Sequence, residues 1–479
     1  MKNTFNKKRT KIYCLMSSLF LSLIIASGQV AAQTNEVSVL KQQMRELQAQ
    51  LKSMQEKLEA IDQDVEQNKQ AVEVTAEAVE AQGSGSSFWD KTSMGGYGEL
   101  HYNNLSADEE RFDTEQIDFH RFVLFFGHEF TDRLRFFSEV ELEHSLAGDD
   151  KPGEVELEQA FVEYDFDQRN TARAGVFLLP IGILNETHEP PTFYGVERNT
   201  VENVIIPTTW WAGGVGYTHR TDNGFTIDLA LHEGLKVPAR SHVERIDSTI
   251  IEGVGVNDGD PILSGNEIEI NDNTSFRSSP ELRFRSGRQK TAEADADDLA
   301  VTGRIKYTGM PGLELAASLQ YQSDITQEGN DTIDSAVLYE AHVVFSQGPF
   351  GLRALYAGWD VDVDSQIDNP NFNPANPVDP VNNPMRIRNP IETADYDSQH
   401  GWYIEPSYKV TPNFGIFVRY EDVAGGRSRD EFEQTTVGFN YYLNESAVLK
   451  ADFQDREHDN AGDSGRDFDG FNLGVGYEF

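Results

Sequence analysis

Phe471-Asn472-Leu473-Gly474-Val475-Gly476-Tyr477-Glu478-Phe479 is the stretch of sequence that decides the fold. Large apolar residues at the odd positions alternate with small or polar residues at the even positions. This period of two predicts a β-strand with one apolar face and one polar face.

Earlier segments repeat the same alternation. In the segment 134–143, one face is mostly apolar and the other is charged. The apolar face has Leu134, Phe136, Ser138, Val140 and Leu142, and the charged face has Arg135, Glu139, Glu141 and Glu143. A soluble β-sandwich also alternates, but it would not usually place so many carboxylates on one strand. An aromatic last residue resembles the C-terminal signature by which the assembly machinery recognises outer-membrane barrels, so we expect that machinery to bind Phe479. The pattern therefore predicts an all-β transmembrane barrel with lipid outside and water inside.

Short turns set the number of strands. Seven tight turns join pairs of alternating segments, at 131–132, 167–170, 221–224, 309–312, 347–349, 411–413 and 444–445. They predict sixteen antiparallel strands, which begin near residues 93, 116, 133, 154, 171, 210, 224, 299, 312, 335, 350, 399, 413, 431, 446 and 467. Short turns belong on the periplasmic side and long loops outside the cell. The loop at about 362–398 is rich in Pro, Asn and Asp, and we expect it to be irregular.

The first 32 residues have the form of a secretory signal peptide. Five basic residues precede an apolar run that ends at Val30-Ala31-Ala32, which predicts cleavage before Gln33. The single cysteine, Cys14, would be removed with this segment. We expect the mature chain to carry neither a disulfide nor a cysteine metal site.

The acidic composition excludes nucleic acid as a partner. The formal net charge is −40, and removal of five basic residues with the signal peptide would take it to −45.

A different period occupies residues 33–82, where apolar residues recur at alternating spacings of three and four. This heptad pattern predicts a periplasmic coiled coil, with a single amphipathic helix on the barrel or on peptidoglycan as the alternative. The predicted seam contains Leu40, Met44, Leu47, Leu51, Met54, Leu58, Ile61, Val65 and Asn68. Residues 83–92, which begin Gly-Ser-Gly-Ser-Ser, are expected to form a flexible linker before a barrel at 93–479.

The third long loop, at about 179–209, is the most distinctive part of the predicted barrel. Together with the strand pattern, the stretch from Gly175 to Asn199 resembles the phosphate-selective porin O and P family. This resemblance implies a trimeric sixteen-stranded porin that is narrowed by an infolded third loop.

The resemblance also implies a constriction lined by charged residues, because members selective for phosphate use arginines and lysines to replace the water of an oxyanion. The candidates that line the pore or its constriction are Arg135, Glu139, Glu141, Glu143, Arg173, Glu186, His188, Glu189, Glu197, Arg198, Glu202, Arg304, Lys306 and Arg419. The third loop holds more carboxylates than cations, which argues against phosphate selectivity. A polar wall that merely keeps water in the pore would explain most of these charges equally well.

The sequence gives little support for a catalytic or cofactor-binding motif. The eleven histidines show no partner pattern typical of a triad, and the Asp-rich stretches lack the glycine and final glutamate of a calcium loop. We therefore expect no enzyme activity, no cofactor and no dedicated metal site.

These observations predict an outer-membrane porin through which small hydrophilic solutes or ions diffuse passively, with a mild cation preference. A phosphate-selective or other anion-selective porin is one alternative. A structural tether, with a closed barrel as anchor and the coiled coil reaching peptidoglycan, is the other. Expected partners are outer-membrane lipid, lipopolysaccharide and two further copies of the chain.

Overall fold

The computed structural model describes residues 88–237, 242–246, 275–279, 282, 284–329, 333–364, 366–368, 386–388 and 396–479. The chain divides into two units, Met1–Ser86 and Ser87–Phe479, and every described residue belongs to the second. The predicted signal peptide and coiled coil lie outside the described residues, as does the linker up to residue 87.

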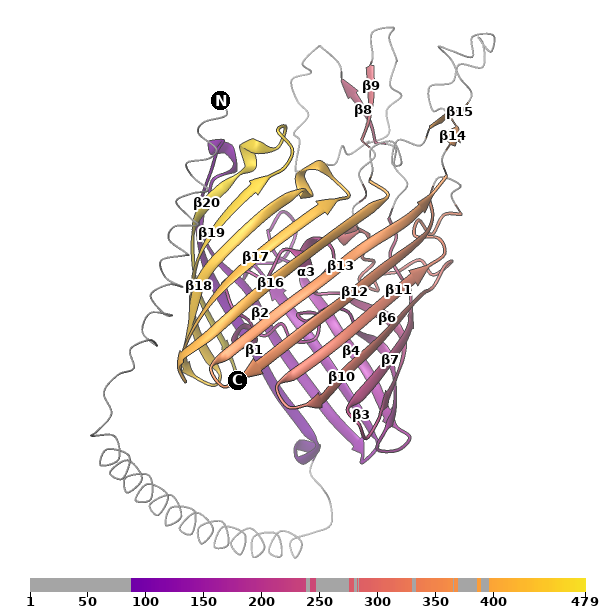
Figure 1. Ribbon diagram of the computed structural model, residues 1–479. Helices are drawn as coiled ribbons and strands as arrows, with labels where there is room; N and C mark the ends of the chain where they lie inside the picture. Colours follow the sequence, from indigo (N-terminus) through magenta and orange to yellow (C-terminus); the bar gives the residue numbers. More distant parts are fainter. Residues whose placement is uncertain are drawn as a thin grey trace, which may run out of the picture. The chain divides into compact units, whose positions relative to one another are not determined.

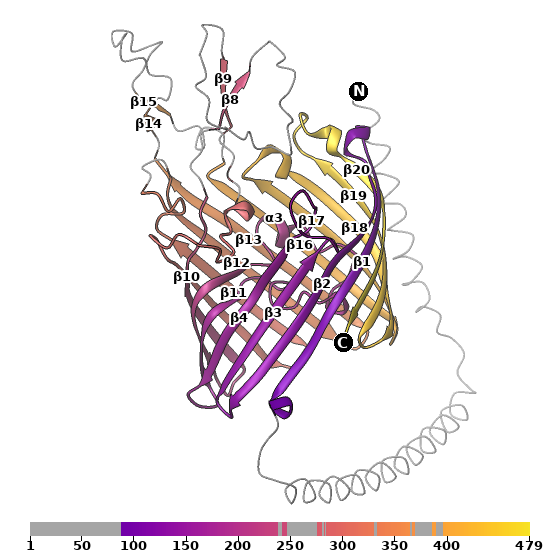
Figure 2. The same ribbon diagram turned by 180° about the vertical axis from the view of Figure 1, so that it is seen from behind.

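Sixteen antiparallel strands form a closed barrel, as the turns predicted (Figures 1 and 2). They are β1 (Thr92–Ala107), β2 (Thr114–Thr131), β3 (Leu134–Glu143), β4 (Val155–Asp165), β5 (Asn170–Leu178), β6 (Trp211–Arg220), β7 (Phe225–His232), β10 (Ala300–Met310), β11 (Leu313–Gln322), β12 (Ile333–Gln347), β13 (Phe350–Val363), β16 (Ser398–Thr411), β17 (Phe414–Gly425), β18 (Phe432–Asn444), β19 (Ala447–His458) and β20 (Phe468–Glu478). Each begins within two residues of its predicted start. The prediction is confirmed because a tight turn fixes both the end of one strand and the start of the next.

The two ends of the barrel differ in the length of their connections. The seven predicted tight turns lie at the end where the chain terminates, and the long connections lie at the other end (Figure 1). Two of the long connections contain two-stranded sheets, β8 (His242–Ile246) with β9 (Ser275–Ser279) and β14 (Gln366–Asp368) with β15 (Arg386–Arg388). The loop at about 362–398, which was expected to be irregular, thus contains one short strand pairing among its described residues. The 3-10 helix η1 (Phe88–Lys91) and the first residue of β1 likewise replace the end of the predicted linker.

Strand β20 has the two faces that its alternation predicted. Phe471, Leu473 and Val475 are more than two-fifths exposed on the outside, whereas Asn472 is fully buried inside. Apolar residues on the outer surface of a barrel are stable where that surface meets lipid. Backbone hydrogen bonds between Phe479 and Gly96 in both directions, at 2.9 and 3.0 Å, continue the pairing of β20 with β1.

None of the helices in the described part of the chain is both long and apolar enough to cross a membrane.

The connection between β5 and β6, residues 179–210, lies inside the barrel. Both ribbon views show its short helix α3 (Val201–Val204) enclosed by the strands (Figures 1 and 2). It also contains the 3-10 helix η3 (Pro190–Thr192). We call this connection the third loop.

Apolar side chains of the third loop form a core with one side of the barrel wall. Ile181, Ile205 and Ile206 are fully buried in a cluster that includes Trp359 of β13 and Leu338 of β12. The indole nitrogen of Trp359 donates a hydrogen bond of 2.9 Å to the carbonyl oxygen of Ile205. Strands whose inner faces would be polar in an empty barrel are therefore apolar here, because the loop covers them.

On β20 the loop approaches so closely that two inward positions are glycine. A Cβ atom on Gly476 would lie 2.2 Å from Cβ of Pro190, and one on Gly474 would lie 3.1 Å from the side chain of Val196. The small residues of the final strand therefore accommodate the loop rather than weaken the strand.

Candidate channel constriction

Two polar side chains hold the third loop in its folded shape. Glu202, which is fully buried, accepts hydrogen bonds of 2.6 Å from the backbone nitrogens of Ile183 and Leu184. Its other carboxylate oxygen accepts from Asn199 at 2.9 Å and from the hydroxyl of Tyr403 on β16 at 3.1 Å. Glu202 was a predicted pore-lining candidate, and the structure places it inside the fold of the loop.

Asn185 connects the two ends of the loop. Its side-chain nitrogen donates to the carbonyl oxygens of Leu179 and Trp210 at 2.8 and 2.9 Å, and its oxygen accepts from the backbone nitrogen of Trp210 at 2.6 Å. Asn185 was not among the predicted site residues, although an asparagine within an apolar run is a recognisable signal for a buried backbone partner.

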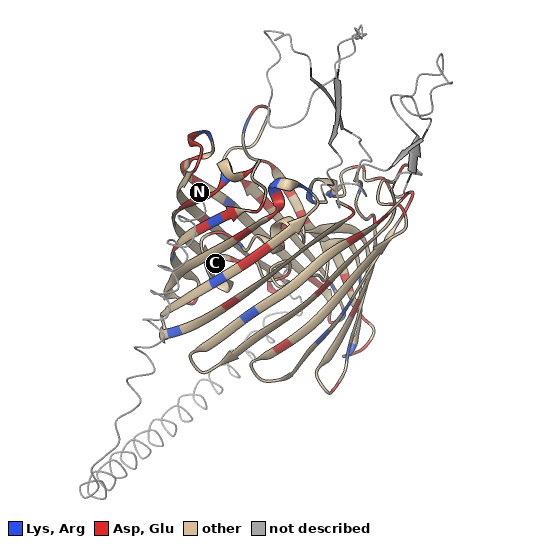
Figure 3. Cartoon of the chain, turned by 45° about the horizontal axis from the view of Figure 1, so that its top comes forward, with Lys and Arg blue, Asp and Glu red and all other residues tan. Residues whose placement is uncertain are grey.

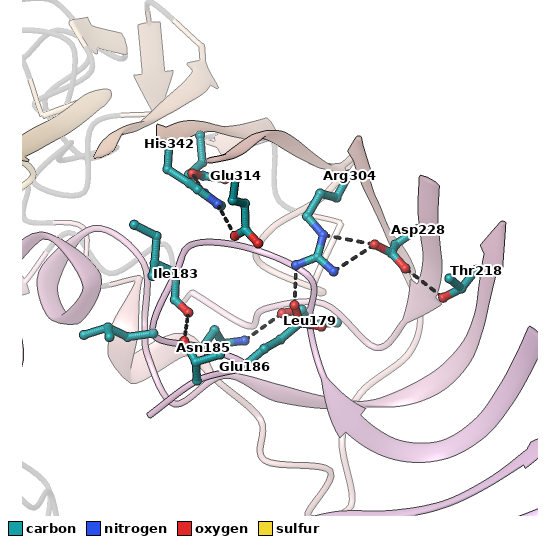
Figure 4. Close-up of polar contacts among 12 residues, drawn as sticks. Leu179, Ile183, Asn185, Glu186, Thr218, Asp228, Arg304, Glu314 and His342 are labelled. Carbon is teal, nitrogen blue, oxygen red and sulfur yellow. Dashed lines mark hydrogen bonds and ion pairs between the residues drawn. The ribbon is translucent and has the colours of Figure 1, made fainter. Parts of the chain in front are cut away.

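On the β10 side, an ion pair fixes the loop to the wall. Arg304 donates to Glu186 of the loop and, through Nε and one terminal nitrogen, to Asp228 of β7 at 3.0 and 2.8 Å. Thr218 donates to the other oxygen of Asp228 at 2.7 Å, so the guanidinium lies between two oriented carboxylates (Figure 4). Glu186 and Arg304 were both predicted, and the structure brings them together.

The lumen wall formed by β1 to β4 is rich in carboxylates. Arg121 lies between Glu99 and Glu141, with nitrogen-to-oxygen distances of 2.7 and 3.8 Å. Glu139, on the same face of β3, accepts a hydrogen bond of 2.6 Å from Gln159. We call Glu139, Glu141, Glu143, Glu156 and Glu158 on β3 and β4 the acidic row.

Three arginines from two loops lie near the acidic row. Arg198 belongs to the third loop, whereas Arg285 and Arg288 belong to the segment between β9 and β10. Partial loss of water and then the neighbouring charges of Arg288 and Arg198 lower the pKa of Arg285 to about 9. Burial also lowers the pKa of Arg288, although the charges of Glu156 and Glu158 act to raise it.

The two arginines after β9 also bind the third loop directly. Arg285 donates to the carbonyl oxygens of Asn203 and Thr208 at 3.2 and 2.9 Å, and Arg288 donates to Pro207 at 3.2 Å and to Thr209. Their cationic groups are therefore held at the loop. Neither was among the predicted candidates, because nothing in an irregular loop sequence shows which residues turn inward.

The remaining predicted arginines each contact different groups. Arg135 is paired with Glu163 and Asp165, and Arg419 with Glu405 and Glu421. Arg173 lies 5.4 Å from the ring centre of Phe177 and has a hydrogen bond of 3.5 Å to Thr218. Lys306, Glu143 and Glu189 are partly exposed. Red and blue segments accordingly lie interspersed along the strands in Figure 3 rather than in separate blocks.

Glu197 of the third loop contacts β1, where it accepts hydrogen bonds from His101 at 3.0 Å and from Asn103 at 2.9 Å. Burial acts to raise the pKa of Glu197, but the charge of His101 and its hydrogen bond outweigh it and lower that pKa to about 2. The loop therefore bears an ionised carboxylate at this contact.

Histidines that are far apart in the sequence also meet near β1. The ring centres of His101 and His120 are 4.7 Å apart, and those of His120 and His144 are 5.7 Å apart. His120 and His144 both contact one oxygen of Asp118, at 3.3 and 2.7 Å. The sequence analysis found no pattern among them because the register of three strands brings them together.

Two solved porin structures and one related sequence are similar to this chain. The barrel is similar in fold to the anion-selective porin from Comamonas acidovorans, with 11% identity, a TM-score of 0.49 and coverage of 81% of this chain and 99% of that chain. It is also similar to OmpF of Salmonella typhi in complex with daunomycin, with 13% identity and a TM-score of 0.48. That match covers 81% of this chain and 97% of that chain. An uncharacterized protein of Aquifex aeolicus is 28% identical over 387 residues, which covers 75% of this chain and 74% of that protein.

The family comparison covers most of the sequence. The profile of the Gram-negative porins matches residues 71–463, which include nearly the whole barrel and the third loop. A closed barrel with an apolar outer face and a polar, charged interior is the architecture expected of such a channel. The chain belongs to the Gram-negative porin family, and it is a porin-like channel of the outer membrane.

Proposed function

We propose that this porin passes small hydrophilic solutes down their gradients and has a mild preference for cations. The acidic row carries the proposal, because its carboxylates lie on two neighbouring strands beside the third loop and two of them, Glu143 and Glu156, are partly exposed. At 0.15 M salt, screening acts over about 8 Å, so ions that pass near this wall feel its charge.

The pairing of the lumen arginines supports the same proposal. Arg135, Arg304 and Arg419 each contact two carboxylates, which leaves them little net charge with which to attract an anion. A continuous arginine ladder would require cationic groups without such neighbours.

Reversal potential in a planar bilayer tests the proposal. With a tenfold KCl gradient across the membrane, the purified full-length channel should give a reversal potential of the sign that indicates higher permeability to potassium than to chloride. A channel that prefers chloride, and whose current falls when phosphate is added, would contradict it.

An anion channel is the second candidate, favoured by Arg198, Arg285 and Arg288. The charges of Arg288 and Arg198 lie close enough to Arg285 to lower its pKa, and oriented guanidinium groups bind phosphate well. This candidate agrees with the resemblance to the phosphate-selective porins. Titration of the chloride current with inorganic phosphate separates the two, because block at submillimolar phosphate is expected only for the anion channel.

We also propose that three copies assemble and that residues 33–82 contribute a coiled coil on the periplasmic side. The heptad spacing of Leu51 and Leu58 supports this arrangement. Replacing both leucines by Asp in the full chain should reduce the yield of cross-linked trimer and leave the conductance of each remaining pore unchanged. A barrel that carries no current but binds peptidoglycan would instead support the tether.

A further inference from the structure

Three side chains meet where the third loop touches the wall between β3 and β4. Glu139 of β3, Glu158 of β4 and His188 of the loop each place one potential ligand atom within 4.8 Å of the other two. All three residues are at most 2% exposed. The chain therefore buries two carboxylates and an imidazole together.

Hydrogen bonds orient two of these groups toward one another. Gln159 donates to Oε2 of Glu139 at 2.6 Å, which leaves Oε1 facing Nε2 of His188 at 3.5 Å. On the far side of the ring, Nδ1 of His188 lies 3.3 Å from the carbonyl oxygen of Asn185. Because a carbonyl only accepts hydrogen bonds, Nδ1 carries the proton, and in the neutral imidazole Nε2 presents a lone pair to the carboxylates.

This arrangement leaves buried electron pairs unsatisfied. Among the described residues, Oε2 of Glu158, Oε1 of Glu139 and Nε2 of His188 have no hydrogen-bond donor or acceptor. The hydroxyl of Tyr97, whose ring lies 5.9 Å from that of His188, is also buried and has no such partner. Buried carboxylates that face a lone pair are stable only with a cation or a proton between them.

We propose that Glu139, Glu158 and His188 bind one divalent transition-metal ion, for which zinc fits best, and that this ion joins the third loop to the barrel wall. One imidazole nitrogen with two carboxylate oxygens is a ligand set that zinc accepts, whereas calcium and magnesium prefer oxygen alone. Two ligand atoms on a tetrahedral zinc ion lie about 3.3 Å apart, given bonds of about 2.05 Å. The separation of 3.5 Å between Glu139 and His188 is close to that value.

The hydrogen bonds that the ligand side chains make to other protein groups match those of known metal sites. A histidine that binds a metal almost always donates its other N–H to a carbonyl or carboxylate, as His188 does to Asn185, and a ligand carboxylate is itself hydrogen-bonded, as Glu139 is by Gln159. The sequence analysis expected no metal site because these ligands come from three separate elements.

A second Glu–Glu–His group in the lumen provides a matched control. His342 contacts Glu314 through Nε2 at 3.1 Å (Figure 4). It contacts Glu340 through Nδ1 at 2.6 Å. Both ring nitrogens are engaged by separate carboxylates, so no lone pair is directed at a shared point. This group has the same residue types, and we expect it to bind no metal.

Zinc content measures the proposed site directly and requires no channel activity. Full-length protein is dialysed against buffered zinc, and zinc per chain is measured by mass spectrometry. A His144→Gln background removes the contribution of the Asp118–His120–His144 group. We expect one zinc per chain in this background and in H342Q, and none in E158Q or H188Q under the same conditions.

Folding of each variant is judged by the mobility of unheated protein in gel electrophoresis. If a ligand variant fails to fold, Gln159→Ala provides a test that leaves all three ligands in place. Loss of this outer hydrogen bond should weaken zinc binding by about 10- to 100-fold, and Co²⁺ in place of zinc should give a visible absorption band that Q159A weakens. Zinc content that is the same in E158Q, H188Q and their parent overturns the proposal. An absence of bound zinc in a folded parent overturns it too and indicates that the carboxylates share a proton.

Discussion

The third loop is held to opposite sides of the lumen by different forces. Toward β12 and β13 it is seated by an apolar core around Ile205 and Trp359, whereas toward β1 to β4 it is held by polar contacts, those of Glu197 with His101 and of His188 with Glu139. Dispersion and burial act at contact and are insensitive to salt and pH, while ion pairs respond to both. We therefore expect the apolar side to set where the loop lies and the ionic side to influence which ions pass it.

Trp359→Ala should break the apolar side and have the largest effect. The indole is parallel to the ring of Phe284 at 4.5 Å and donates to Ile205, so truncation leaves a cavity and an unpaired carbonyl. Such changes cost about 3–5 kcal/mol. The expected result is new protease cleavage within residues 179–209 and a noisy, larger conductance.

Trp402→Ala is the matched control for this variant, because Trp402 of β16 is 37% exposed on the outer surface. It should leave cleavage of the loop unchanged. Equal sensitivity of the two variants would show that the apolar core does not seat the loop.

Glu202→Gln should test whether a buried carboxylate on the apolar side acts as part of the loop fold. The amide cannot accept all four of the hydrogen bonds that the carboxylate accepts with the same strength. Hydrogen bonds to charged groups contribute about 1.5–3 kcal/mol each, so we expect a loss of about 2 kcal/mol. Thermal unfolding of the barrel measures this loss of stability. Glu189→Gln, at a partly exposed position, is the control. A change in ion selectivity without a change in stability would instead assign Glu202 to the pore.

Charge changes on the ionic side should alter selectivity with little effect on stability. Glu143→Gln with Glu156→Gln should reduce the cation preference about threefold, equivalent to about 0.65 kcal/mol. Arg285→Gln with Arg288→Gln should shift the reversal potential in the opposite direction. Both shifts should shrink between 0.1 and 1 M KCl, as the screening length falls from about 10 to about 3 Å. If the two double variants shift the reversal potential in the same direction, the acidic row does not govern ion selectivity.

Acid should weaken the ionic side before the apolar side, and this is the smallest expected effect. The pKa of Glu197 is lowered to about 2 in the folded chain, so its contact with His101 contributes fully above the unfolded pKa of about 4.3. That contribution is lost as the pH falls from about 4.3 toward 2. Protease cleavage of the third loop should increase over this range, and Glu197→Gln should show no such dependence. A step in cleavage at neutral pH would contradict this assignment.

Much of the barrel could be predicted from the sequence, but little of its interior. Strand starts follow from tight turns, and the face of each residue follows from the period of two, so the lumen position of Glu139 was predictable. What lies opposite Glu139 was not, because His188 comes from a loop without a period. The apolar run at Ile181, Ile183 and Leu184 was a usable signal, since an exposed loop would not retain it.

Charge alone was a poor guide to role within the loop. Glu202 and Glu186 look alike in the sequence, yet Glu202 accepts backbone N–H groups and Glu186 pairs with Arg304. Distinguishing them needs the backbone path of the loop, and that path is set by long-range packing against β12 and β13.

The glycines of β20 have a consequence for how this channel can evolve. A Cβ atom at Gly476 would collide with Pro190, and one at Gly474 would require Val196 to shift by a few tenths of an ångström. Variation at these four positions is therefore linked, and a substitution in one strand of the wall is acceptable only alongside a compensating change in the loop. New solute preferences can arise most readily along the acidic row and at the arginines after β9, while the segment of the loop that touches the closing strand is held to its present sequence.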